Sequence, residues 1–268
     1  MITDLQGIIK TILEEIKQQM DIAIVGMSGG ADSTLVALLC CQALGPQRVY
    51  SVHMPATSHD EATFNNDSRR VASALGLQQY TVPIAGIAES ILGSCRTALG
   101  LERLSQVNEG NGRVRARMCV LYTLCHHLGK SLELRSRVVG TGNLSEDFIG
   151  YDTKGGDSLA DIFPIGELFK SEVYQLLDYF VGEKLILDSM INRTPSAGLW
   201  LEQTDENELG YTYAAMEAPI RAYLAGTLSE TSSTGDLEPV ARFVLERHRA
   251  HAHKHLAPSV VRLRHFCK

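Results

Sequence analysis

Gly26-Met27-Ser28-Gly29-Gly30-Ala31-Asp32-Ser33 is the stretch that decides the fold. It overlaps the end of a short apolar, β-branched run at residues 22–27, which is typical of a buried strand. Residues 34–44 follow with the pattern of a helix that ends at Gly45-Pro46. In such a turn the glycines let backbone amides approach an anion, and the helix start directs its positive end at the same spot. The segment therefore predicts a phosphate-binding loop between a strand and a helix.

The remainder of the chain continues this alternation of strands and helices. Further strands are expected at residues 48–53, 79–84 and 137–141, and helices at 5–16, 61–75 and 114–128. Such alternation implies parallel β-α-β crossovers, and hence helices on both faces of one sheet. Helices dominate after residue 166, at 167–179, 211–224 and 238–253, whereas residues 144–164, 199–209 and 228–237 are expected to be connections. We therefore expect one doubly wound parallel α/β domain over residues 1–268, with a helical C-terminal extension.

Composition excludes several classes of protein. With 268 residues, 44% hydrophobic and 21% charged, the chain is a globular protein and not a disordered one. Its net charge of −6 disfavours nonspecific binding to nucleic acid or membrane surfaces. The six cysteines form no CxxC pair, which favours free thiols in a reducing compartment. No apolar run approaches the roughly 20 residues of a membrane span, and no signal-peptide pattern opens the chain. We expect a cytoplasmic protein that contacts neither nucleic acid nor membrane.

The acid inside the loop narrows the class of ligand. Asp32 would repel a bare phosphate, but it fits if a divalent cation lies between its carboxylate and the phosphates. The alternative is an ordinary turn in which Asp32 and Ser33 cap the helix; a serine on each side of the glycines favours phosphate binding. Neither a Walker Gly-Lys-Ser/Thr nor a GxGxxG fingerprint occurs here. SGGxDS instead resembles the loop of the ATP pyrophosphatases, which implies that the loop holds the pyrophosphate that leaves ATP.

Later segments make the resemblance more specific. They are Val139-Gly140-Thr141-Gly142-Asn143-Leu144-Ser145-Glu146, Gly150-Tyr151-Asp152-Thr153-Lys154, Ser158-Leu159-Ala160-Asp161, Pro195-Ser196-Ala197-Gly198-Leu199-Trp200, Gln203-Thr204-Asp205-Glu206 and His253-Lys254. With the loop they span residues 22–254 and resemble the ammonia-dependent NAD+ synthetase family. The resemblance implies a Rossmann-like three-layer α/β/α fold of the adenine nucleotide alpha-hydrolase type.

The resemblance also implies roles for individual residues. It implies that Asp32 and Glu146 coordinate Mg2+. Separately, ammonia must lose a proton to attack, and Asp161 is the candidate catalytic acid near the site that could accept it. ATP would contact the loop residues Gly26, Met27, Ser28, Gly29, Gly30, Ala31, Asp32 and Ser33 together with Thr141, Lys170 and Ser196. Deamido-NAD would contact Arg115, Lys154, Asp161, His253 and Lys254.

Simple chemistry supports the cationic part of this set. The substrates bring a pyrophosphate, a carboxylate and the ATP phosphates together, so compensating cations are needed. Arg113, Arg115 and Arg117 lie two apart, so that at most one or two of them can face the site from one helix, and the middle one matches the family. Lys154 precedes two glycines, a setting suited to a lid. Here the loop departs from the family, because an aromatic residue is lost and Ser158-Leu159 replaces two glycines, which leaves its packing and closure open.

The implied reaction joins ATP, deamido-NAD and ammonia to give AMP, pyrophosphate and NAD+ through an adenylated carboxylate. Only about 20 residues precede the first strand, so no glutaminase domain is expected; ammonia would be free or supplied by a separate protein. The family resemblance also implies a homodimer. Two alternatives stay open: another ATP pyrophosphatase, such as a GMP-synthetase-type amidator or a tRNA-thiolating enzyme, and a nucleotide-binding module without catalysis. The presence of Asp32, Glu146 and Lys170 favours an enzyme.

Overall fold

The computed structural model of the chain describes residues 2–56, 58–186, 204–229, 237–257, 259 and 261. Its elements, in chain order, are α1 (Leu5–Gln19), β1 (Ile22–Gly26), α2 (Ala31–Leu44), η1 (Pro46–Arg48), β2 (Val49–His53), α3 (Ser58–Leu75), β3 (Gln78–Thr81), α4 (Ala85–Leu99), α5 (Gln106–Leu132), β4 (Ser136–Val139), α6 (Leu144–Phe148), α7 (Lys170–Gly182), α8 (Asp205–Leu209), α9 (Tyr213–Leu224), α10 (Pro239–His251) and η3 (Ala252–Lys254). None of the described helices is long and apolar enough to cross a membrane.

The four described strands form one parallel sheet in the order β3-β2-β1-β4. In the register, Ile24 of β1 lies between Tyr50 of β2 and Val138 of β4. From β1 the chain first moves outward through β2 and β3, and then returns to β4 on the other side of β1. Crevices that bind ligands in open parallel sheets form at the carboxyl ends of strands where the order reverses in this way. The fold therefore places the loop after β1 beside the segment that follows β4.

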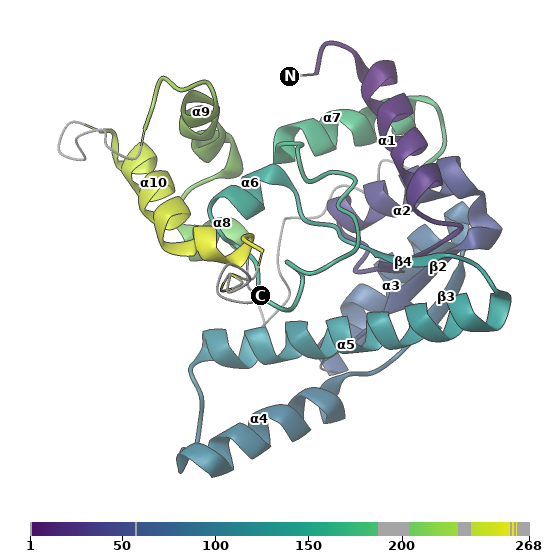
Figure 1. The fold of residues 1–268 in the computed structure, drawn as a ribbon, viewed down its shortest axis with the longest axis horizontal. Helices are drawn as coiled ribbons and strands as arrows, with labels where there is room; N and C mark the ends of the chain where they lie inside the picture. The colour runs from purple at the N-terminus through teal and green to yellow at the C-terminus, as the bar shows by residue number, and fades with distance from the viewer. Residues whose placement is uncertain are drawn as a thin grey trace, which may run out of the picture.

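Helices cover both faces of the sheet because successive strand residues point to opposite faces. Ala23 and Val25 pack in a core cluster with residues of α1, α2 and α7, whereas Ile22 and Ile24 pack with residues of α4 and α5. Figure 1 shows α4 and α5 along the lower edge of the view, with α1 and α7 on the opposite side of the sheet. The doubly wound α/β fold predicted from the sequence is confirmed.

The C-terminal helices build a third cluster beside this sheet. Its buried residues come from α6 and the segments around it and from α8, α9 and α10, and they are Phe148, Ile149, Phe169, Leu209, Tyr213, Met216, Ile220 and Val244. In Figure 1, α6, α8, α9 and α10 form a group to one side of the strands, where the strands' carboxyl ends open. This group is the predicted helical extension, and it supplies a second wall to the crevice.

Several elements differ from their predicted bounds. α2 begins at Ala31 and not at residue 34, so that Asp32 lies in its first turn. α4 is not predicted by the sequence, because only one narrow stripe of it is buried (Ala88 and Leu92) while other apolar residues face outward. The expected connections at 144–164 and 199–209 contain the short helices α6 and α8. Hydrogen-bonding caps, not hydrophobic periodicity, begin both helices: Asn143 accepts from the Glu146 N–H, and Thr204 accepts from the Asn207 N–H.

Candidate active site

The turn after β1 is held in a compact form by its own serines and glycines. Ser28 Oγ lies 3.1 Å from Ser33 Oγ and accepts from the Gly30 N–H at 3.2 Å. Gly29 has φ +77°, and a Cβ there would come within 2.6 Å of the Ser68 backbone nitrogen. Glycine is therefore required at position 29 by both its backbone conformation and its packing. The first N–H groups of α2, which have no intrahelical acceptors, follow this turn and provide the donors of an anion site.

Asp32 and Glu146 meet at one cation, the ammonium group of Lys170. Lys170 Nζ lies 2.5 Å from Asp32 Oδ2 and 2.9 Å from Glu146 Oε1. The Lys170 side chain is 5% exposed and the two carboxylates are 19% and 18% exposed. Asn143 ties the acids together from the other side, since its Nδ2 donates to Asp32 Oδ1 at 3.1 Å while its Oδ1 caps α6 at Glu146. Residues from three separate segments thus converge at the carboxyl end of the sheet.

The electrostatics of this group favour a bound cation. The pKa of Glu146 is raised to about 8, first by burial and then by the Asp32 and Asp205 carboxylates, against the lowering effect of Lys170. Burial disfavours the Lys170 ammonium, but the Asp32 and Glu146 carboxylates outweigh it and raise the pKa of this lysine. Asp32 and Glu146 therefore share one lysine, and Asp205 is near enough to Glu146 to raise its pKa.

A cavity of about 440 Å³ opens above these residues. Its lining includes many of the predicted site residues: Gly26, Met27, Ser28, Gly30, Ala31, Asp32, Ser33, Thr141, Glu146, Lys170 and Lys254. Among the described residues, Gly29, Arg115, Lys154, Asp161 and His253 are predicted site residues that lie outside this lining. Ser196 lies outside the residues that the structure describes.

Four of the predicted deamido-NAD residues take part in contacts that join the loop to the C-terminal segment. Arg115 Nε donates to the Lys154 carbonyl at 3.2 Å, and Lys154 Nζ donates to the His253 carbonyl at 2.7 Å. Lys254 Nζ donates to the carbonyls of Gly150 and Asp152 at 2.8 and 2.6 Å. The loop after α6 and the segment after α10 are therefore fastened together at the mouth of the cavity.

Asp161 and two arginines of α5 make protein contacts that the motifs did not specify. Asp161 Oδ2 accepts from the Val138 N–H at 2.8 Å, and its Oδ1 accepts from the Tyr122 hydroxyl at 3.4 Å. This carboxylate therefore supports the end of β4. Of the three arginines spaced two apart, Arg117 lines the cavity, whereas Arg115 contacts the loop carbonyl.

The altered loop is closed by the residues that make it unusual. Ser158 Oγ donates to the Thr153 carbonyl at 2.8 Å, and the Thr153 N–H donates to Asp157 Oδ1 at 2.6 Å. Gly156 packs so closely on Val114 that a Cβ would come within 2.7 Å of the valine side chain. A serine in place of a glycine thus adds a hydrogen bond to the turn.

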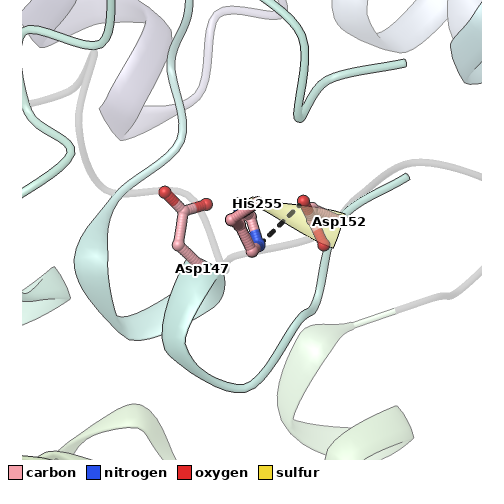
Figure 2. A group of neighbouring side chains, drawn as sticks. All are labelled: Asp147, Asp152 and His255. Carbon is pink, nitrogen blue, oxygen red and sulfur yellow. Dashed lines mark ion pairs between the residues drawn. The ribbon is translucent and has the colours of Figure 1, made fainter. Parts of the chain in front are cut away.

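A second charged group lies at the junction of the loop and the C-terminal segment. Figure 2 shows Asp147, Asp152 and His255 turned toward one another, with His255 Nε2 3.2 Å from Asp152 Oδ2. Lys254 Nζ lies 3.3 Å from Asp152 Oδ1, so this carboxylate contacts both a lysine and a histidine. The hydrogen bond that His255 donates to Asp152 raises the pKa of His255, while burial raises the pKa of Asp147 to about 6. We interpret the group as part of the junction between loop and C-terminal segment.

Three side chains of the site are not among the predicted residues. Asn143 joins Asp32 to the start of α6. Asp205 is 3% exposed and lines the cavity, and the Tyr213 hydroxyl donates to its Oδ2 at 2.9 Å. Asp205 lies in the quoted Gln203–Glu206 motif, so its acid was visible. No sequence motif pointed to Tyr213, because its place in the site depends on how α9 packs.

A glycine-rich turn after a central strand of a parallel sheet, with acids and a lysine beside it, is typical of nucleotide-binding α/β proteins of the adenine nucleotide alpha-hydrolase-like fold. The family model for NAD synthase matches residues 1–258. The chain is 37% identical over 250 residues to the NH(3)-dependent NAD(+) synthetase of Methanosarcina acetivorans, covering 92% of each protein. The chain belongs to the NAD synthase family, and as such is a ligase that uses ATP.

Two solved structures resemble the fold over almost its whole length. The NMN synthetase from Francisella tularensis has a TM-score of 0.76 at 26% identity, covering 97% of this chain and 99% of that one. The NH3-dependent NAD synthetase from Campylobacter jejuni has a TM-score of 0.71 at 26% identity, covering 97% and 100%. The family resemblance predicted from the sequence is confirmed.

Proposed function

We propose that this chain amidates the nicotinate carboxylate of deamido-NAD with ammonia and cleaves ATP to AMP and pyrophosphate. The observation that carries the proposal is the meeting of Asp32 and Glu146 at one cation beside the phosphate loop. The family and the ammonia-dependent relatives support the choice of reaction.

The chemistry explains why ATP is needed. A carboxylate is a poor acceptor for ammonia, because an oxide would have to leave. Attack of the carboxylate oxygen on the α-phosphorus forms an acyl adenylate and breaks the bond from the α-phosphorus to the oxygen that bridges it to the β-phosphorus. Pyrophosphate departs with that bonding pair. Ammonia then forms the C–N bond and displaces AMP, and a base takes the proton that the nitrogen loses.

The phosphate loop and Lys170 stabilise the leaving group in this scheme. The first N–H groups of α2, which follow the turn, would face the charge that develops on pyrophosphate, and preorganised donors of this kind usually supply the largest catalytic term. Lys170, at the first turn of α7, brings a full positive charge to the same place. Its ammonium would exchange contacts with Asp32 and Glu146 for contacts with phosphate oxygens when ATP binds.

The donor set suits Mg2+. Two carboxylate oxygens that already reach a single nitrogen atom can reach a single small cation, and oxygen is the ligand atom that Mg2+ prefers. When bound, Mg2+ would be held by Asp32 and Glu146 and would supply charge neutralisation to the phosphates of ATP.

The basic residues at the cavity mouth are proposed to bind deamido-NAD. Arg115, Lys154, His253 and Lys254 join the loop and the C-terminal segment through backbone carbonyls. A substrate with anionic groups would draw the cationic side chains to itself. Asp161 is proposed as a further contact from the end of β4. To accept a proton from ammonia it would first have to give up its bonds with Val138 and Tyr122.

The match to an NMN synthetase makes a mononucleotide acceptor the second candidate. That structure has a higher TM-score to this chain than the Campylobacter jejuni NAD synthetase has. Both substrates carry the same nicotinate carboxylate, so the catalytic residues serve either one. The two differ in the adenylate half, which only deamido-NAD brings to the binding site.

We also propose that residues 1–268 act as a single synthetase domain, as a homodimer. Apolar side chains on the outer face of α4 and the adjoining start of α5 are exposed: Ile87, Ile91, Leu99, Leu101 and Val107 are between 39% and 63% exposed. Burial of this face against a second copy would remove it from water. The cytoplasmic location stays a prediction.

A pyrophosphate-release assay tests the reaction. Purified protein with ATP, Mg2+ and ammonium is expected to release pyrophosphate with deamido-NAD and to form NAD+, more slowly with nicotinic acid mononucleotide, and not with xanthylate or without an acceptor. Replacement of ammonium by glutamine should stop amide formation. Asp32→Ala should abolish pyrophosphate release, whereas Asp178→Ala, which removes an exposed acid of α7, should leave it unchanged. Faster turnover of the mononucleotide, efficient use of glutamine, or an active Asp32→Ala variant would each contradict part of the proposal.

A further inference from the structure

Tyr213 connects the apolar C-terminal cluster to the charged centre of the site. It is the first residue of α9, where Thr212 caps the helix, and it is 5% exposed. Its ring belongs to the third core cluster, with Phe148 and Met216. Its hydroxyl reaches the acids: it donates to Asp205 Oδ2 at 2.9 Å and lies 3.5 Å from Glu146 Oε1.

The ring also faces the lysine of the site. Lys170 Nζ lies 5.4 Å from the centre of the Tyr213 ring, within the range of a cation–π contact. The same Glu146 oxygen that accepts from Lys170 is the one near the tyrosine hydroxyl. One side chain therefore contacts both a proposed metal ligand and the cation that now neutralises it.

We propose that Tyr213 is a positioning residue for the metal-binding carboxylate of Glu146, with Asp205 as its anchor. This inference rests on the proposed function, because it assigns Glu146 to the metal. A hydroxyl has one proton, and its contact with Asp205 is the shorter of the two. The bond to Asp205 holds the hydroxyl oxygen in place. The oxygen in turn limits the positions that the neighbouring Glu146 carboxylate can take. When Lys170 turns to the ATP phosphates, Tyr213 and the Asn143 cap remain beside this carboxylate and keep it directed at the space that it shares with Asp32.

Residues that hold a metal ligand in position, without touching the metal, contribute to metal affinity. Their loss usually lowers metal affinity or activity by about 10–100-fold. A tyrosine that only filled space in the cluster would act differently, since removal of its hydroxyl would leave the ring and its packing unchanged. Tyr213→Phe separates these roles because phenylalanine keeps the ring over Lys170 and removes only the hydroxyl.

The experiment measures metal binding directly. Mn2+ is titrated into the protein in the presence of a non-hydrolysable ATP analogue, and free Mn2+ is read by electron paramagnetic resonance. Tyr213→Phe is expected to weaken Mn2+ binding about tenfold and to raise the half-saturating Mg2+ concentration in the pyrophosphate assay equally. The KM for deamido-NAD should stay within about twofold. Tyr80→Phe, on the edge strand β3, is the matched control and should bind Mn2+ like the unsubstituted protein.

A second variant keeps the test decisive if Tyr213→Phe folds poorly. Asp205→Ala removes the anchor and should also weaken Mn2+ binding, and the double variant should be no weaker than Tyr213→Phe alone, since coupled residues are not additive. Unchanged Mn2+ affinity in Tyr213→Phe, or additive losses in the double variant, would overturn the inference. The titration needs no acceptor, so a wrong acceptor in the proposed function would leave its outcome intact. Failure of the unsubstituted protein to bind Mn2+ would overturn both.

Discussion

Lys170→Met is the substitution that probes the charge balance of the site most directly. The lysine side chain is 5% exposed, and its ammonium contacts Asp32 and Glu146 at 2.5 and 2.9 Å. Methionine keeps an apolar stem of similar length but leaves the two carboxylates without their shared cation. Removal of one partner from a buried ionic group costs about 3–5 kcal/mol. At about 2–4 °C per kcal/mol for chains of roughly this size, the unfolding temperature should fall by about 6–20 °C.

The loss should depend on pH in a defined direction. Burial raises the pKa of Glu146 to about 8, so the folded state holds this proton more tightly than the unfolded chain does. A carboxyl with a raised pKa costs stability in its charged form, and the cost grows until the pH passes the folded-state pKa. Without Lys170 the pKa rises further. The stability deficit of Lys170→Met should therefore be larger at pH 8.5 than at pH 6.

Divalent metal should reverse the loss, and this is the decisive measurement. Because a cation between the carboxylates replaces the missing ammonium, Mg2+ at about 10 mM should raise the unfolding temperature of Lys170→Met more than that of the unsubstituted protein, in which the lysine competes. Thermal unfolding is followed with and without Mg2+, and Lys130→Met, which removes an exposed lysine of α5, serves as the control. A Lys170→Met protein as stable as its parent, or an equal Mg2+ effect on both, would refute the reasoning.

Three further predictions follow from single contacts. Gly29→Ala should destabilise the protein by more than the roughly 1–2 kcal/mol that an alanine in a left-handed conformation costs, because the new Cβ would also meet the Ser68 backbone. Gly100 has φ +65° but open space around it, so Gly100→Ala should show only the conformational cost. Denaturant titrations of both variants measure the difference in the free energy of unfolding. The raised pKa of Glu146 should make Mg2+ affinity rise with pH, by up to about tenfold per pH unit below 8 and levelling off above it, in calorimetric titrations; a pH-independent affinity would contradict this. Ile91→Glu on the exposed face of α4 should convert the dimer to a monomer in light scattering, and an unchanged mass would reject that face.

The local pattern of the sequence is sufficient for the central part of the fold. The run at 22–27, the glycine-rich turn and the following helix form because β-branched residues, glycines and a cap signal act over a few neighbouring residues. The prediction for α4 failed for a related reason. Its apolar residues divide between a buried stripe and an exposed face, with Ile84 and Leu92 inside and Ile91 outside, so no single face shows in the sequence.

The candidate site is partly readable from the chain. Asp32, Glu146 and Lys170 are all named in the sequence analysis, and the structure brings both acids within hydrogen-bond distance of the lysine. The carboxylate of Asp161 accepts from a strand N–H, a contact that no motif reveals, and its catalytic role stays a prediction.

The sequence by itself determined the strand-and-helix order, the phosphate loop and the family, because these depend on residues close in the chain or on motifs of recognisable spacing. Only the tertiary structure decided that Lys170 bridges Asp32 and Glu146, that Asn143 bonds to Asp32 beside them and that the Tyr213 hydroxyl lies near Glu146. These contacts join residues from about 20 to more than 100 positions apart. Their distances are set by the packing of α6, α7 and α9 against the open end of the sheet, and a packing of that kind is a property of the whole folded chain.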